Sequence, residues 1–229
     1  MRISELFYSI QGEGKLMGVP SVFVRASGCN LRCVWCDTPY ASWQPEGEDQ
    51  SVAAIVDQVT RFPARHAVIT GGEPMIMPDI TELCAALKAR DFHITIETAA
   101  TVFADVKLDL ASLSPKLSNS TPTNREGGRF ARAHERNRLN VEVIQQFIDS
   151  SLDFQLKFVV CEPTDLVEIR ELLGRLKNWS PDDVLLMPEG IDQTTQDQRA
   201  GWISEVCKTE GYRFCPRLHI LLYGNRRGT

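Results

Sequence analysis

The chain has 229 residues, of which 43% are apolar and 24% are charged, and its formal net charge at pH 7 is -5. A chain of this length and apolar content can bury one substantial core, so we expect a single domain over residues 1–229. The acidic balance argues against a protein that coats nucleic acid, and no apolar run approaches the roughly 20 residues of a membrane span. We therefore expect neither nucleic acid nor a membrane as a partner.

Short apolar runs alternate along the chain with segments of helical period, which is typical of repeated β-α units. The runs predict six strands, over residues 21–26, 66–70, 92–97, 154–160, 184–187 and 214–221. Apolar stripes predict helices around residues 52–59, 80–87, 166–176 and 202–207. Because a complete eight-fold barrel takes about 250 residues, we expect an α/β fold of the incomplete (β/α)6-type, similar to a TIM barrel. Its active site should lie at the carboxyl ends of the strands.

The amino-terminal segment ends in a glycine-rich stretch, Ile10-Gln11-Gly12-Glu13-Gly14, and Arg25 lies inside the first predicted strand. The amide of Gln11 and the carboxylate of Glu13 could pair with a purine-like or pterin-like ring. The guanidinium of Arg25 could bind a substrate carboxylate through two hydrogen bonds. A glycine-rich turn with a structural ion pair explains the same residues equally well, so both interpretations stay open at this point.

Three closely spaced cysteines follow the first predicted strand, Cys29, Cys33 and Cys36 in GCNLRCVWC. Thiolates bind both zinc and iron–sulfur clusters. A structural zinc site usually has four protein ligands, and no fourth Cys or His follows within a short loop, so the spacing favours a 4Fe-4S cluster with one open iron. Seven cysteines in all, and an amino terminus without a basic segment before a long apolar stretch, predict a reducing cytoplasm.

Two further motifs carry polar groups, and the first of them directly follows the predicted strand over residues 66–70. In Thr70-Gly71-Gly72-Glu73-Pro74 the glycines allow a ligand to approach the backbone, and Glu73 adds a carboxylate. Leu113-Ser114-Pro115-Lys116 offers a hydroxyl and an ammonium that could contact ribose hydroxyls and a carboxylate. Each motif alone is more simply a turn, but together with the cysteine loop they favour one shared site.

Residues 118–140 interrupt the apolar rhythm with Ser, Thr, Asn, Gly and five arginines. We expect a polar insertion here, as a loop or a frayed helix. RNA binding or partner docking is conceivable, but a solvated surface segment is the simpler interpretation and the one we favour.

The segments FYSIQGEG, FVRASGCNLRCVWCDT, ITGGEP, IETAAT and DLASLSPKL, in this order and at these intervals, resemble the 7-carboxy-7-deazaguanine synthase family of radical S-adenosylmethionine (SAM) enzymes. The resemblance is dense over about the first half of the chain. It implies a lyase that converts 6-carboxy-5,6,7,8-tetrahydropterin to 7-carboxy-7-deazaguanine with loss of ammonia, in 7-deazapurine (queuosine) biosynthesis. It also implies a 4Fe-4S cluster, SAM and Mg2+ as cofactors, an electron donor of the flavodoxin or ferredoxin type, and a homodimer.

The resemblance further implies roles for individual residues, and none of them is a catalytic side chain beyond the cofactor-bound radical. The metal ligands are Cys29, Cys33 and Cys36 for the cluster and Thr38 for Mg2+, with Asp37 ranked below Thr38 because an acidic residue after a cysteine loop is often a turn former. The implied SAM contacts are Gly72, Glu73, Ser114, Pro115, Lys116, Met187, Pro188, Glu189 and Gly190. The implied substrate contacts are Ile10, Gln11, Gly12, Glu13, Arg25 and Thr70.

The last third of the chain departs from the family pattern. LLMPEGID and CPRLHILLYGNRRGT stand where better-known members carry a Gln-Pro segment and a Gln-Thr-His-Lys stretch, which leaves the role of the tail open. Two rival functions remain. A radical SAM activase that forms a glycyl radical on a partner protein would share the cysteine loop and GGEP, but not IQGEG, Arg25 and SPK together. A zinc-binding interaction module would need no GGEP and would be colourless.

Overall fold

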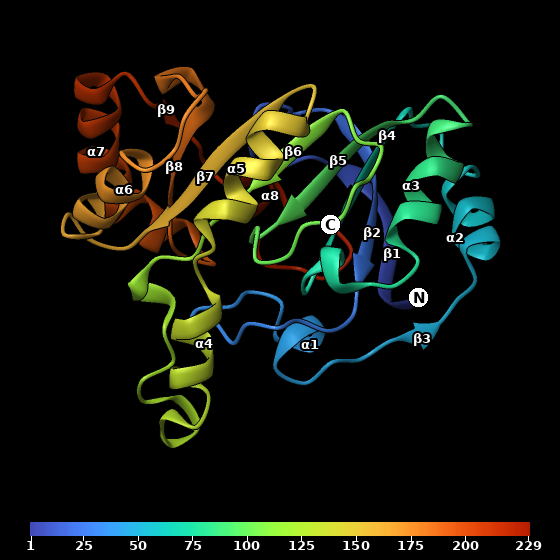
Figure 1. Ribbon diagram of the computed structural model, residues 1–229, viewed down its shortest axis with the longest axis horizontal. Coiled ribbons are helices and arrows are strands. Elements are labelled where there is room, and N and C mark those ends of the chain that lie inside the picture. The colour runs from blue at the N-terminus through green and yellow to red at the C-terminus, as the bar shows by residue number, and fades with distance from the viewer.

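The computed structural model describes residues 1–229 and has at its centre a nine-stranded sheet of order β3-β1-β2-β4-β5-β6-β7-β8-β9 (Figure 1). From β2 to β9 every neighbouring pair is parallel, whereas β1 is antiparallel to both β2 and β3. The outer strands β3 and β9 do not pair with each other, so the sheet stays open. This confirms the expected incomplete α/β barrel.

The principal parallel strands are short, apolar and largely buried. They are β2 (Pro20–Ala26), β4 (His66–Gly71), β5 (His93–Thr98), β6 (Leu110–Leu113), β7 (Phe154–Val160) and β8 (Val184–Pro188). A parallel strand covered on both faces is a continuous apolar run, which is why five of the six were predictable. The sixth, β6, has only four residues and ends directly before the Ser114-Pro115-Lys116 motif, so it gave no separate signal.

Five helices pack their apolar faces against this sheet (Figure 1). They are α2 (Val52–Val59), α3 (Ile80–Lys88), α5 (Val141–Ser150), α6 (Asp165–Leu173) and α7 (Gln193–Glu210). The side chains of Ser51, Asn140 and Asp192 each accept a hydrogen bond from a backbone N–H three residues later, which fixes the starts of α2, α5 and α7. None of the helices combines the length and hydropathy needed to cross a membrane.

The two ends of the chain differ from expectation. The amino terminus forms a strand, β1 (Arg2–Ile10), which reaches a two-residue edge strand, β3 (Glu48–Asp49). The strand predicted over residues 214–221 is wrong: β9 covers only Arg213–Phe214, and a helix, α8 (Leu218–Tyr223), follows. The cause is Pro216, because proline has no N–H to continue the ladder.

The expected polar insertion at residues 118–140 contains more regular structure than a loop. It consists of two 3-10 turns (Ser118–Ser120 and Arg125–Gly128) and the helix α4 (Ala131–Asn137). Figure 1 shows α4 beyond the end of the sheet, on the same side as the short helix α1 (Pro39–Ser42). One residue of α4 faces inward, since His134 is only 2% exposed.

The predicted motifs gather at one edge of the sheet. The cysteine loop follows β2, the GGEP turn follows β4 and begins a 3-10 turn at Pro74–Ile76, and Ser114 follows β6. Backbone bonds join the first two, because the N–H of Gly72 donates to Ala26 (3.0 Å) and the N–H of Glu73 donates to Gly28 (2.9 Å). Parallel strands present their carboxyl ends together, and this edge therefore carries the site.

The tight contact at Gly72 leads to a stability prediction. A Cβ at this position would lie 2.0 Å from the carbonyl oxygen of Gly28 and 2.6 Å from that of Ala41, and backbone atoms cannot move aside cheaply. We expect Gly72→Ala to lower the free energy of unfolding by about 1–3 kcal/mol, measured by urea denaturation. The control is Gly201→Ala in α7, where nothing lies within 4 Å of the added carbon. That change should raise stability by about 0.5–1 kcal/mol, and equal effects of the two variants would mean that the close backbone contact at Gly72 has no energetic cost.

Candidate active site

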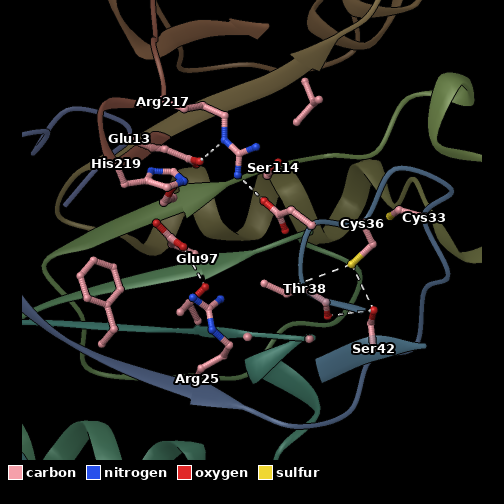
Figure 2. A pocket seen from close by; sticks show the side chains of 18 of the residues that line it. Glu13, Arg25, Cys33, Cys36, Thr38, Ser42, Glu97, Ser114, Arg217 and His219 are labelled. Atoms are coloured by element: carbon pink, nitrogen blue, oxygen red, sulfur yellow. Dashed lines mark hydrogen bonds and ion pairs between the residues drawn. The ribbon is translucent and has the colours of Figure 1, made fainter. Parts of the chain in front are cut away.

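A cavity of about 440 Å³ opens at the carboxyl edge of the sheet. Figure 2 shows Cys33, Cys36 and Thr38 on one side of it and Glu13, Arg217 and His219 on the other. The structure brings most of the predicted site residues into the cavity wall. These are the three cysteines, Thr38, Gly72, Ser114, Lys116, Met187, and all six predicted substrate contacts, Ile10, Gln11, Gly12, Glu13, Arg25 and Thr70.

The three thiols of the cysteine loop share this wall, and their chemistry fits an iron–sulfur cluster. Burial raises the pKa of Cys29 and of Cys33 to about 12, so a cationic metal group is needed to make these thiolates stable. No group of three or more Cys, His, Asp or Glu side chains is arranged to hold a single metal ion. A four-iron cluster binds each thiolate on a different iron and does not require such convergence.

Beside the cysteines, Cys36 Sγ lies 3.1 Å from the hydroxyl oxygen of Ser42 and 3.8 Å from that of Thr38. Thr38 immediately precedes α1 and lines the cavity, at the position where the family resemblance implies a Mg2+ ligand. Asp37 lines the cavity as well, but its carboxylate is already paired with Arg217.

The insertion holds the cysteine loop in place, which corrects the expectation of a merely solvated segment. The N–H of Arg32 donates to Nδ1 of His134 (3.1 Å), and the N–H of Val34 donates to the carbonyl of Ser120 (2.8 Å). The indole N–H of Trp35 donates to Asn119 (3.2 Å). Burial lowers the pKa of His134 to about 4, so the ring is neutral and its Nε2–H donates to the Ser120 hydroxyl (2.9 Å).

The GGEP turn contributes its glycines to the cavity but not its carboxylate. Glu73 is 0% exposed and lies outside the wall. Its carboxylate accepts hydrogen bonds from the Thr98 hydroxyl (2.6 Å) and from the N–H groups of Met75 and Ala99 (3.1 and 2.9 Å). The side chain predicted to contact SAM thus connects the end of β4 to the end of β5.

Four other predicted SAM contacts also lie outside the wall: Pro115, Pro188, Glu189 and Gly190. The carboxylate of Glu189 pairs with Arg199 at 3.3 Å, and the carbonyl of Gly190 accepts a bond from Arg217 (2.7 Å). By contrast, Lys116 faces the cavity, and its ammonium donates to the carbonyl and hydroxyl oxygens of Ser114 (2.6 and 2.8 Å).

Arg25 and Glu97 lie on the part of the wall that carries the predicted substrate contacts. Arg25 Nε donates to Glu5 (2.6 Å), and this is the one hydrogen bond that the Arg25 guanidinium makes. Both terminal nitrogens of Arg25 therefore remain available for a carboxylate. Glu97, at the end of β5, accepts from the Gln11 amide (3.1 Å) and from the Thr70 hydroxyl (2.8 Å).

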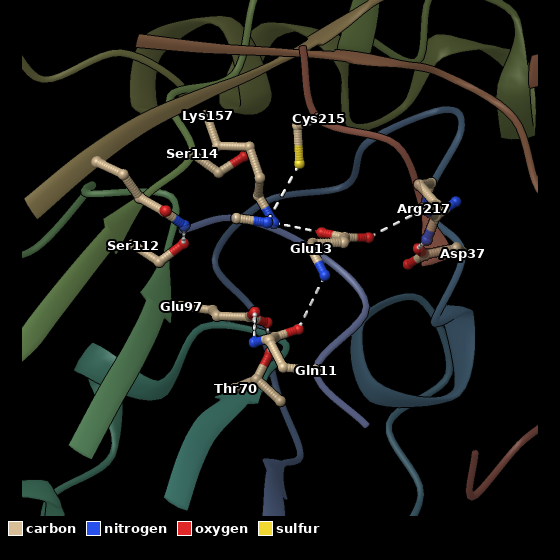
Figure 3. Close-up of polar contacts among 12 residues, drawn as sticks. Gln11, Glu13, Asp37, Thr70, Glu97, Ser112, Ser114, Lys157, Cys215 and Arg217 are labelled. Carbon is tan, nitrogen blue, oxygen red and sulfur yellow. Dashed lines mark hydrogen bonds and ion pairs between the residues drawn. The ribbon is translucent and has the colours of Figure 1, made fainter. Parts of the chain in front are cut away.

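A buried charge network surrounds Glu13 (Figure 3). Its carboxylate pairs with Lys157 of β7 and with Nε of Arg217 (2.9 Å), and Arg217 also pairs with Asp37. Burial alone would raise the pKa of Glu13, but the charges of Lys157 and Arg217 outweigh it and lower that pKa well below its ordinary value. Glu13 is therefore ionised at neutral pH, and its role is at least partly to hold these cations.

Sequence reasoning missed several residues of this wall. Glu97 closes a predicted strand, and Lys157 is a lone charge inside the apolar strand FQLKFVV, a signal of the same kind as Arg25. Arg217 gave no signal, since it lies in the tail whose role was open. The tail in fact contributes Arg217, His219, Asn225, Arg226, Arg227 and Thr229 to the cavity.

Comparisons with known proteins agree with this geometry. Residues 23–118 match the Radical SAM superfamily. The 7-carboxy-7-deazaguanine synthase of Rhodopirellula baltica is 45% identical over 99% of this chain and 88% of its own, and that of Halobacterium salinarum is 43% identical over 97% and 90%.

Solved structures extend the likeness to three dimensions. The crystal structure of QueE from Escherichia coli superposes with a TM-score of 0.69 and 26% identity, over 95% of this chain and 94% of that one. Streptococcus suis SuiB bound to SAM shares only the fold, at a TM-score of 0.55 and 14% identity over 83% of this chain and 48% of SuiB. From the two long matches above 40% identity, the chain belongs to the 7-carboxy-7-deazaguanine synthase family of radical SAM enzymes.

Proposed function

We propose that this enzyme converts 6-carboxy-5,6,7,8-tetrahydropterin to 7-carboxy-7-deazaguanine with loss of ammonia, in queuosine-type 7-deazapurine biosynthesis. The observation that carries the proposal is one cavity with three thiols on one wall and a guanidinium with two free nitrogens on another. Its volume of about 440 Å³ suits a small molecule. A glycyl-radical activase is not favoured for two reasons. Its substrate would be a protein segment, whereas this cavity suits a small molecule, and the two long matches are named 7-carboxy-7-deazaguanine synthase rather than activase.

The cofactors would occupy the cysteine side of the cavity. Cys29, Cys33 and Cys36 would hold the 4Fe-4S cluster, which with SAM supplies a 5'-deoxyadenosyl radical for hydrogen abstraction. Supporting SAM binding, Gly72, Ser114, Lys116 and Met187 line the same wall. The Lys116 ammonium offers a positive charge for a carboxylate, and the Ser114 hydroxyl offers a partner for ribose.

The substrate would lie between Arg25 and Glu97. The free nitrogens of Arg25 would bind the pterin carboxylate as a bidentate pair, while Glu5 holds the guanidinium in place from behind. Glu97, Gln11 and Thr70 together offer an acceptor, an amide and a hydroxyl for the polar edge of the ring. The tail residues cover the cavity and would exclude water from the reacting centre.

Further parts of the proposal rest on the family relationship. They are Mg2+ bound at Thr38 beside the substrate carboxylate, a homodimer, a flavodoxin or ferredoxin as electron donor, and a cytoplasmic location. Thr38 supports the first, because its hydroxyl is an oxygen ligand of the kind that Mg2+ prefers and it lines the cavity.

The first test is anaerobic turnover of the reconstituted protein with SAM, dithionite, Mg2+ and 6-carboxytetrahydropterin, followed by mass and ultraviolet absorbance. We expect 7-carboxy-7-deazaguanine from the wild type and none from Cys33→Ala, because the two remaining thiolates would leave the cluster without its third protein ligand. Cys84→Ala is the matched control, since Cys84 is a buried core residue of α3, and the activity of this variant per cluster should be retained. Cleavage of SAM without change of the pterin would refute the substrate assignment and keep the cluster.

Arg25→Ala tests the carboxylate clamp. Loss of a charge-assisted hydrogen bond costs about 1.5–3 kcal/mol, so KM for the pterin should rise about 10–100-fold. Cluster absorbance and SAM binding should not change, because Arg25 contacts neither the cysteines nor the SPK segment. The control is Arg61→Ala, which removes an exposed arginine just after the end of α2 and should leave KM unaltered. An unchanged KM in Arg25→Ala would exclude the clamp.

Glu13→Gln tests the charge network by leaving buried cations without their partner. Removing one member of a buried ion pair costs about 3–5 kcal/mol, so the free energy of unfolding at pH 7 should fall by roughly this amount. The control Glu205→Gln breaks an exposed pair with Lys208 and should cost less than about 1 kcal/mol. Since the pKa of Glu13 is lowered from 4.5, its contribution is complete above that pH and is lost as the pH falls further. The difference in free energy of unfolding between wild type and Glu13→Gln should therefore be constant above pH 4.5 and decrease below it. A difference that grows on acidification would mean that the ionised form of Glu13 is not the one that stabilises the fold.

A further inference from the structure

The outer surface of the insertion carries a concentration of positive charge that the catalytic cavity does not use. Residues 118–140 contain five arginines and two glutamates, in a chain whose net charge is -5. Two of the arginines have structural partners: Arg138 pairs with Glu135 and Glu168, and Arg125 donates to the carbonyl of Val34 (3.0 Å). The other three, Arg129, Arg132 and Arg136, are exposed and make no ion pair or side-chain hydrogen bond.

These three arginines, which we call the arginine patch, lie on a segment that is bonded directly to the cysteine loop. Within α4, His134 lies between Arg132 and Arg136 in sequence and accepts the hydrogen bond from the backbone of Arg32. The helix that carries two of the three arginines is therefore bonded to the loop through a buried side chain, in addition to the bonds that Ser120 and Asn119 make. Figure 1 shows α4 outside the sheet, so its outer face is open to a partner.

The loop itself is thinly covered on this side. Val34, midway between Cys33 and Cys36, is 38% exposed, although apolar side chains usually avoid water. The neighbouring Trp43 has its indole N–H bonded to the carbonyl of Cys33 (2.9 Å), and the guanidinium of Arg125 stacks on its ring at 3.8 Å. Arginine is enriched in protein–protein interfaces, and unpaired charges at an interface steer the encounter with an oppositely charged partner.

We infer that the arginine patch, together with the exposed Val34 of the cysteine loop to which the insertion is bonded, is the docking surface for a small acidic electron-carrier protein. The inference rests on the proposed function, because only a radical SAM activity requires an electron from outside. Electron transfer weakens steeply with distance, so the carrier must bind where the cover over the cysteine loop is thin. One electron passes from the reduced carrier, which is oxidised, to the cluster held by the loop, which is reduced. No bond is made or broken and no proton is transferred in this step.

The experiment compares two triple charge reversals in the reconstituted holoenzyme. The test variant carries Arg129→Glu, Arg132→Glu and Arg136→Glu. The matched control carries Arg65→Glu, Arg90→Glu and Arg175→Glu, which are exposed, unpaired and located before β4, before β5 and after α6. Both variants change the net charge equally. The probe is an acidic bacterial flavodoxin, with dithionite as the reductant that needs no docking surface.

We expect the test variant to bind oxidised flavodoxin at least about tenfold more weakly than the wild type, and its flavodoxin-dependent kcat/KM to fall in proportion. Turnover with dithionite, measured per cluster, should match the wild type, and the control variant should match it with both reductants. Raising the ionic strength should weaken flavodoxin binding to the wild type and have little effect on the test variant.

Other outcomes overturn the inference. Unchanged flavodoxin affinity in the test variant excludes the patch as the docking surface. An equal loss of affinity in both variants would mean that the net charge of the enzyme, and not the patch, determines binding. Binding of a single-stranded RNA through the same arginines, with flavodoxin affinity unaltered, would make the patch a nucleic-acid surface. If dithionite turnover also falls, the affinity measurement still decides, because it does not depend on catalysis. Failure of the wild type with dithionite would count against the proposed function instead.

Discussion

The position of the cysteine loop depends on backbone hydrogen bonds to segments that are distant in sequence. On its inner side, the carbonyl of Gly28 accepts the N–H of Glu73, and the N–H of Gly28 donates to Ala41. On its outer side, the backbone of Arg32 and of Val34 is bonded to the insertion. A loop of this length has no regular structure of its own to fix it, so these contacts supply the order that three thiols on one cavity wall require.

The opposite wall is ordered by charge rather than by backbone pairing. Glu13 joins the amino-terminal glycine-rich stretch to Lys157 of β7 and to Arg217 of the tail, and Arg217 extends the network to Asp37, next to the last cysteine. Ions buried in this way are tolerated only when each has a partner, because an unpaired buried charge loses several kcal/mol of hydration. The network therefore ties the divergent tail to the cysteine loop, and both surround the same cavity.

The fold was largely predictable because buried parallel strands are apolar runs that local sequence reveals. The errors are equally local in origin. Pro216 stopped an apolar segment from continuing as a strand, and the apolar residues after it form α8 instead. In the insertion, a polar composition suggested full solvation, whereas His134, Ser120 and Asn119 bond the segment to the cysteine loop. Composition describes the average environment of a segment and cannot identify which of its residues, here Ser120 and His134, turn inward.

The sequence by itself singled out the three closely spaced thiols, the glycines at the end of β4 and Arg25, because each belongs to a short motif that local sequence reveals, and all of them line the cavity. Only the tertiary structure decided that the Glu73 carboxylate lies behind the cavity wall and that Glu97 lies within it. It also decided that Glu13 meets Lys157 and Arg217, which are 144 and 204 residues away along the chain. A charge in a sequence has no fixed partner until the strands are ordered in space, since burial and distance, and not residue type, set the strength of each pair.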